Sequence, residues 1–185
     1  MIPNRRQCLQ LMEEYGMLEN IVSHSLEVTR VALYLSSELN KRGQCIDLGL
    51  VEAASLLHDI AKTPCLQTRE DHTEAGYLLL KKIGYERVGR IVEQHVWLKQ
   101  DGIPGSVSEE EVVNYADKRV RHDQIVSLRE RFQDLKARYG RDQAAIEYLD
   151  RMKQAIAGVE RKIFLILRIH PNALNQFLEK GGENA

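Results

Sequence analysis

The sequence has little of what marks several large classes of protein. Its three cysteines, Cys8, Cys45 and Cys65, are odd in number and form no Cys-x-x-Cys pair, which excludes a disulfide framework and a thiolate zinc site. The densest apolar run, residues 163–167, is far too short to cross a membrane, and the N-terminus has no apolar signal region. These absences predict a cytoplasmic protein with reduced thiols and no membrane partner.

Neither sign of charge dominates the chain. The 26 basic and 27 acidic residues leave a net charge of -1, so the protein lacks the broad positive field typical of nucleic-acid binders. This balance argues against a nucleic-acid polymer as partner and favours a small substrate. With 185 residues, of which 43% are hydrophobic, the chain is expected to form a single domain over residues 1–185.

Apolar residues recur with helical spacing along the chain, and no segment alternates with the period of a strand, so we predict an all-α fold. Helices are expected at about 4–15, 20–40, 47–62, 71–83, 85–97, 108–120, 125–139 and 145–170, with a short one near 173–178. Asp47 is an expected N-cap, and Ser108 with Glu111 forms a capping box. Pro64 is expected to end the third helix, and residues 98–107 form a loop long enough to be one wall of a pocket.

The long C-terminal helix carries an apolar seam spaced alternately by three and four residues. Its members are Leu149, Met152, Ile156, Val159, Ile163 and Ile166. Such a seam fits either a helix packed on the core or a contact between two copies of the chain. We favour the packed helix and leave a homodimer open.

The most informative stretch is Leu-Leu-His-Asp-Ile-Ala-Lys, residues 56–62. Lys62 follows His58 by four residues and Asp59 by three, so all three side chains can face one cavity. Imidazole nitrogen together with carboxylate oxygen suits Fe, Mn, Co, Ni or Zn better than Mg. An isolated His-Asp pair also fits a solvated helix end beside a core histidine, so the pair alone leaves both interpretations open.

Two further residues lie on separate predicted helices. His24 is on an apolar stripe one turn before Val28 and therefore points toward the core, where it is either a hydrogen-bonded core residue or a ligand. Asp117 lies in mid-helix beside Ala116, where an unpaired inward carboxylate would be unfavourable. Asp117 thus either faces solvent or has a cation beside it.

The order His24, then His58-Asp59, then Asp117 resembles the signature of the HD-domain metal-dependent phosphohydrolases. The resemblance covers about residues 20–131 and leaves a C-terminal helical extension at about 141–180. It implies an HD-domain helical bundle with additional C-terminal helices, in which the four signature residues hold a first metal ion.

Members of that family with a second metal ion have two more histidines, which His72 and His95 match here. The resemblance then implies a dinuclear site in which Asp59 bridges both ions. Subfamilies that cleave cyclic dinucleotides follow the later histidine with another, whereas this chain has Val96, and their Gly-Tyr-Pro is replaced by residues 101–105. These departures argue against a cyclic-dinucleotide phosphodiesterase.

The activity implied is that of a phosphomonoesterase or phosphodiesterase acting on a small phosphorylated molecule, with a nucleotide favoured, by attack of a metal-activated hydroxide. Asp59 and Lys62 are the candidate catalytic residues, and Lys62 would neutralise charge on the phosphoryl group or the leaving oxygen. Arg121, four residues after Asp117, is a candidate substrate-binding residue together with Lys62.

A cluster of cations follows Asp117: Lys118, Arg119, Arg121, Arg129 and Arg131. Such clusters are usually solvated helix faces, and we expect the same here. If some of these cations line the mouth of the pocket, a nucleotide or polyphosphate is the natural partner.

Two other functions remain open from the sequence. HD-fold proteins with two irons and the same ligands include mixed-valent oxygenases that cleave C–C or C–P bonds with dioxygen, and ligand identity does not separate them from hydrolases. A non-catalytic domain that binds a nucleotide as a signal, aided by dimerisation through the C-terminal seam, is the second alternative. The sequence does not identify the substrate.

Overall fold

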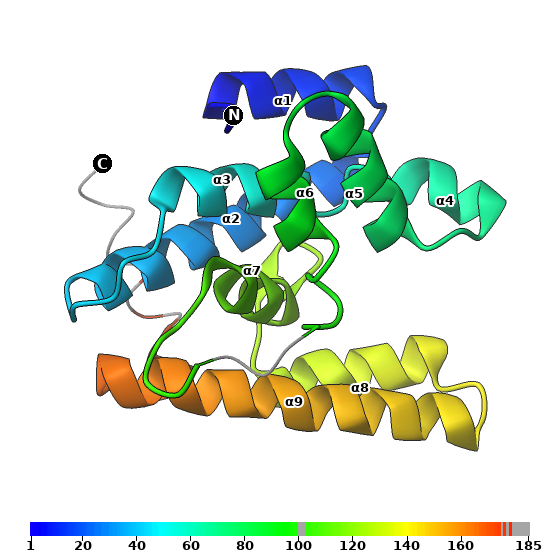
Figure 1. Ribbon diagram of the computed structural model, residues 1–185. Helices are drawn as coiled ribbons and strands as arrows, with labels where there is room; N and C mark the ends of the chain where they lie inside the picture. Colours follow the sequence, from blue (N-terminus) through cyan, green and yellow to red (C-terminus); the bar gives the residue numbers. More distant parts are fainter. Residues whose placement is uncertain (100–102, 175, 177, 179–185) are drawn as a thin grey trace.

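A computed structural model describes residues 1–99, 103–174, 176 and 178, and it confirms the all-α prediction (Figure 1). The helices are α1 (Arg5–Glu14), α2 (Glu19–Asn40), α3 (Leu48–Leu57), α4 (Lys62–Thr68), α5 (His72–Lys82), α6 (Glu86–Val92), α7 (Glu109–Lys118), α8 (Leu128–Tyr139) and α9 (Gln143–Leu167), followed by the 3₁₀ turn η1 (Pro171–Ala173). The strands β1 (Val120–Arg121) and β2 (Gln124–Ile125) form a small antiparallel hairpin. Within the described residues, no helix is long and apolar enough to span a membrane.

Helix α2 is the centre of the bundle. It packs against α3 and α7 and also contacts α9, so its predicted apolar stripe, which includes Val28, Leu35 and Leu39, is fully buried. Figure 1 shows α1 on one side of the α2–α3 layer and the antiparallel pair α8–α9 on the other side, beyond α7. The middle of the chain therefore lies between an N-terminal helix and a C-terminal helix pair.

The two largest errors in the predicted helix ends concern the segments that carry His58 and His95. Helix α3 ends at Leu57 instead of Lys62, residues 58–61 form a turn, and Lys62 begins α4. Pro64 lies in the first turn of α4, where its missing amide hydrogen has no partner to lose. The helix predicted to reach Trp97 ends at Val92, so His95 lies in the turn beyond α6.

The predicted caps are largely as expected. The Asp47 carboxylate accepts a hydrogen bond from the amide of Leu50, and Ser108 with Glu111 forms a complete capping box. The Asp71 carboxylate caps α5 by accepting a hydrogen bond from the amide of Thr73. These caps fix where α3, α5 and α7 begin.

The α8–α9 pair covers the bundle on the side of α7. The seam residues Leu149, Met152, Ile156, Val159 and Ile163 are buried, and all but the first belong to the main hydrophobic core. The structure thus agrees with a helix packed on the core, while the homodimer stays a prediction. Parts of two predicted segments, residues 100–102 in the 98–107 loop and residues 175 and 177 in the last short helix, lie outside the described residues.

Candidate metal centre

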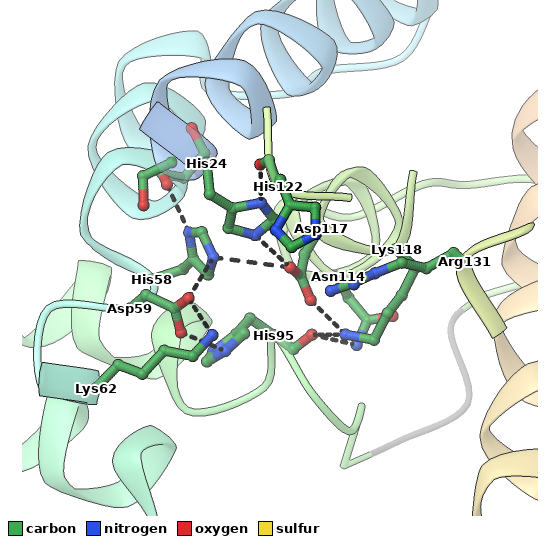
Figure 2. A network of polar contacts seen from close by, with 12 residues as sticks. His24, His58, Asp59, Lys62, His95, Asn114, Asp117, Lys118, His122 and Arg131 are labelled. Atoms are coloured by element: carbon green, nitrogen blue, oxygen red, sulfur yellow. Dashed lines mark hydrogen bonds and ion pairs between the residues drawn. The ribbon is translucent and has the colours of Figure 1, made fainter. Parts of the chain in front are cut away.

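The structure brings six predicted ligand side chains together from different parts of the bundle. His24 comes from α2, His58 and Asp59 from the turn between α3 and α4, His72 from the start of α5, His95 from the turn after α6, and Asp117 from α7. All except His72 are buried. Figure 2 shows the side chains of His24, His58, Asp59, His95 and Asp117 turned toward a common centre.

The first cluster lies around His58. Potential ligand atoms of His24, His58 and Asp59 all lie within 4.8 Å of one another. Asp117 joins them, because its Oδ1 atom is 2.9 Å from Nε2 of His24 and 3.8 Å from Nε2 of His58. Four side chains could thus hold one cation here.

The second cluster shares Asp59 with the first. Its Oδ1 atom is 3.3 Å from Nε2 of His72 and 3.5 Å from Nε2 of His95, and the two Nε2 atoms are 3.2 Å apart. Because one carboxylate has two oxygens, Asp59 is positioned to contact both cations of a dinuclear site.

Backbone carbonyls fix the orientation of three imidazole rings. Nδ1 of His24 lies 2.8 Å from the carbonyl oxygen of His122, Nδ1 of His58 lies 2.8 Å from that of Ser55, and Nδ1 of His95 lies 2.7 Å from that of Val92. A carbonyl only accepts, so each Nδ1 carries the hydrogen and donates it. The opposite nitrogen, Nε2, is left to face the cluster, which is the usual arrangement around metal-ligating histidines.

Two buried polar atoms at the centre lack hydrogen-bond partners in the described part of the chain, which is direct evidence for a cation site. Nε2 of His58 and Oδ1 of Asp59 are inaccessible to solvent and have no hydrogen-bond partner among the described residues. Leaving a buried polar atom without a partner costs about 1–3 kcal/mol. A divalent cation in contact with these atoms would remove that cost, and the mixed nitrogen and oxygen donors suit a transition metal. The residues present therefore fit a metal site.

The charges of the site oppose the effect of burial. Burial favours neutral acids, but the adjacent His58 holds the pKa of Asp59 well below its usual range, and Lys118 does the same for Asp117. Burial lowers the pKa of His58, yet Asp59 and Asp117 outweigh it and the pKa is raised. At His95 burial prevails and lowers the pKa to about 4. The centre thus stabilises two carboxylates and attracts positive charge.

Lys62 contacts the site as predicted, whereas Arg121 does not. Nζ of Lys62 lies 2.6 Å from Oδ2 of Asp59. Arg121 was placed four residues after Asp117 on the assumption of a continuous helix, but α7 ends at Lys118 and Arg121 lies on β1. It is absent from the walls of the cavity beside the metal centre, as far as the described residues show. Its proposed role therefore has no geometric support.

Two of the expected surface cations are buried instead. Lys118 bonds to Oδ2 of Asp117 and to the carbonyl oxygen of His95, at 3.1 Å in the second case. Arg119 donates from Nε to the carbonyl oxygen of Val126 at 2.7 Å and also bonds to the hydroxyl group of Tyr115. Internal acceptors satisfy both cations, which is why they are not part of a solvated face.

Several residues that support the site have no signal in the sequence. The amide group of Asn114 donates to the carbonyl oxygens of Gln94 and His95 and so holds the turn that carries His95. His122 supplies a backbone carbonyl from a left-handed position with φ of 57°. A carbonyl contact is independent of side-chain identity, so no motif could have revealed it.

A cavity of about 580 Å³ opens onto the metal centre. Its charged lining residues besides the predicted ligands are Lys62, Glu70, Lys118, Arg131 and Arg138. Its apolar and aromatic lining residues include Leu18, Ile21, Val96, Leu135, Tyr139, Tyr148, Leu149 and Met152. The α8–α9 pair therefore forms one wall of the cavity, a part of the site that the resemblance left unexplained.

Comparison with known proteins identifies the same region. A family model for the HD domain matches residues 21–139. A tRNA (cytidine(56)-2'-O)-methyltransferase of Picrophilus torridus is 32% identical over 145 residues, which make up 70% of this chain and 40% of that protein. A ribonuclease Y of Ureaplasma parvum is 34% identical over 88 residues, or 47% of this chain and 17% of that protein. The chain thus spans less than half the length of these relatives, and no solved structure matches it.

Proposed function

The chain belongs to the HD domain family, a superfamily of metal-dependent phosphohydrolases, and on this basis we propose that it hydrolyses a phosphate ester of a small molecule, with a nucleotide as the favoured substrate. The observation that carries the proposal is the pair of ligand clusters sharing Asp59 at the wall of the cavity. The family and the local geometry together support this proposal.

When bound, two divalent cations supply a hydroxide from water near neutral pH and neutralise charge on phosphoryl oxygens. His24, His58 and Asp117 would hold one cation, and His72 and His95 the other, with Asp59 contacting both. The carbonyl contacts of His24, His58 and His95 keep Nε2 aimed at the centre before any ligand arrives. This chain therefore contributes a prearranged site, which is the main protein contribution to phosphoryl transfer.

Lys62 is suited to bind the charge that develops during the reaction. Its side chain is 38% exposed, so it can reach substrate in the cavity while it contacts Asp59. Burial opposes its charged form, but Asp59 outweighs this effect and raises the pKa of Lys62, which keeps the amine protonated. A protonated amine at this position can neutralise a phosphoryl oxygen or the leaving oxygen.

The apolar side of the cavity favours a nucleotide over a smaller phosphate ester. A nucleotide base could contact the aromatic and aliphatic surface of Tyr139, Tyr148, Leu149 and Met152. Basic side chains that could bind its phosphate line the same cavity. RNA is the competing substrate, because the names of the relatives refer to a ribonuclease and a tRNA methyltransferase. The net charge of -1 favours the small molecule over the polymer.

The test begins with metal analysis of the full chain purified without chelator. Release of inorganic phosphate is then measured with a panel of nucleotides and sugar phosphates, and cleavage of a short RNA is measured by chromatography of the fragments, with Mn, Fe, Co, Ni or Mg added. We expect metal-dependent phosphate release from at least one nucleotide and none with Asp59→Ala. The absence of both phosphate release and RNA cleavage with every compound would refute a hydrolase, and dioxygen uptake in the same assays would instead favour the oxygenase.

A further inference from the structure

One cation in the wall of the cavity has an unused hydrogen-bond donor. The side chain of Arg131, on α8, is only 11% exposed, yet its Nε atom is inaccessible to solvent and has no partner among the described residues. An Nη1 contact with Oδ2 of Asp134, at 3.4 Å, holds the guanidinium group from one side. Nη2 of Arg131 has no hydrogen bond among the described residues either, so the guanidinium group keeps donors for a ligand that supplies acceptors.

The other cations in the cavity are already engaged or exposed. Lys118 is bonded to Asp117 and to a backbone carbonyl, and Lys62 is paired with Asp59. Arg138 is 40% exposed and also pairs with Asp134. Among the described lining residues, Arg131 is thus the cation that combines burial with an unpartnered donor.

The charges around Arg131 leave an excess of positive charge. Asp134 is a single carboxylate and contacts two guanidinium groups, those of Arg131 and Arg138. One negative charge between two positive ones leaves a net charge of about +1 at this wall. An anionic group in the cavity would balance it.

The side chain of Arg131 is directed toward the metal centre. Figure 2 shows it extending from α8 toward Asp117 and Lys118, while Lys62 approaches the centre from the opposite side. Among the described residues, Arg131 forms no ion pair with Asp59 or Asp117. It can therefore bind an anionic group that lies in the cavity between Arg131 and Lys62.

We propose that Arg131 binds the phosphoryl oxygens of the substrate, opposite Lys62. A guanidinium group is planar, always charged and presents its donors as a fork that matches phosphate, and Asp134 orients that fork. This role replaces the one predicted for Arg121 and places a substrate-binding residue on the C-terminal helix pair. The inference rests on the proposed function for the identity of the anion.

Binding of inorganic phosphate to the Mn-loaded full chain, measured by calorimetry, tests the proposal. Arg131→Met keeps an unbranched stem but removes the guanidinium group with its charge and donors, and we expect phosphate to bind about tenfold more weakly or worse, as for loss of a charge-assisted hydrogen bond. Its manganese content should equal that of the wild type. Arg129→Met, on the same helix but exposed, is the matched control and should leave phosphate binding unchanged.

Phosphate affinity of Arg131→Met within about twofold of wild type, with full manganese content, would overturn the proposal. If circular dichroism shows that this variant does not fold, Arg131→Lys decides, because lysine keeps the charge but lacks Nε–H and the fork. Wild-type affinity in that variant would also overturn the proposal. A failure of the proposed function gives a different result. The wild-type protein would then hydrolyse no ester, although inorganic phosphate would still bind to it more tightly than to Arg131→Met.

Discussion

The two ligand clusters of the metal centre differ in how firmly they are held. In the first, His24 and His58 are buried and each is oriented by a backbone carbonyl. In the second, His95 is held in the same way, but the side chain of His72 is 26% exposed. Nδ1 of His72 also has no hydrogen bond in the described part of the chain. Both histidines of the first cluster are thus held by backbone carbonyls, while the second cluster has one histidine for which the described residues supply no such contact.

Because of this difference, we expect the first cluster to bind a cation more tightly than the second cluster. A ligand whose orientation is fixed in advance loses less freedom when it binds, which favours tighter binding. We therefore expect the ion at His24 and His58 to be retained, and the ion at His72 and His95 to exchange more readily. Asp59 belongs to both clusters, so their affinities should also be coupled.

The largest effect is expected from Asp59→Ala, which removes the residue common to both clusters. Both ions should be lost and phosphate release should fall by roughly 10³-fold or more. Elemental analysis and the phosphate assay measure the two outcomes. Glu13→Ala, on the exposed face of α1, is the control for loss of a carboxylate. Full metal content and full activity in Asp59→Ala would contradict the assignment of the site.

The comparison is tested directly by His24→Ala and His72→Ala. His24→Ala should lose the firmly held ion, and His72→Ala should lose only the exchangeable one and keep about one metal per chain. Metal content after dialysis distinguishes them, with the exposed His170→Ala as control. Equal losses in both variants would show that the two clusters do not differ in the way their hydrogen bonds indicate.

A smaller effect is expected at Lys62, which lies beside the clusters and belongs to neither. Lys62→Met should leave both ions bound and slow turnover by roughly 10- to 100-fold, because one charge that stabilises the phosphoryl group is removed. The rate and the metal content are measured on the same sample. An unchanged rate would exclude Lys62 from the reaction.

The smallest effect is expected in how metal affinity depends on pH. Asp59 and Asp117 raise the pKa of His58, so a proton competes with the first cation, and this competition ends as pH rises above the raised pKa. The pKa of His95 is lowered to about 4, so His95 is already neutral near pH 7 and offers the second cation no such competition. From about pH 6.5 upward, the ordinary pKa of histidine, affinity for the first ion should therefore rise as His58 loses its proton, while His95 stays neutral. Manganese titrations across that range measure both.

How far the sequence predicts this molecule depends on the length of each element. The long helices were predicted because an apolar stripe such as that of Val28, Leu35 and Leu39 repeats over several turns. The hairpin was not, since strands of two residues are too short to show a period. The same hairpin explains the error at Arg121, because a four-residue spacing brings side chains together only while the helix continues.

The ligands of the site were predicted from the sequence, but the residues that surround them were not. A polar group on an inward helix face needs a partner, which singled out His24 and Asp117, and the resemblance to the HD-domain signature then assigned them as ligands. The cavity wall could not be predicted, since the position of α8 and α9 depends on tertiary packing. Arg131 therefore looked like one more surface cation, although it is nearly as buried as the ligands themselves.

The anchoring of the imidazole rings by main-chain oxygens has a consequence for how this protein tolerates change. Positions 55, 92 and 122 supply an atom that every amino acid has, so substitutions there that preserve the backbone leave the aim of the ligands intact. The left-handed backbone at position 122 favours Gly, Asn, Asp or His, whereas positions 55 and 92 are buried, so packing limits the side chains there. The side chains that follow these carbonyl groups can thus change while the imidazole rings keep their orientation.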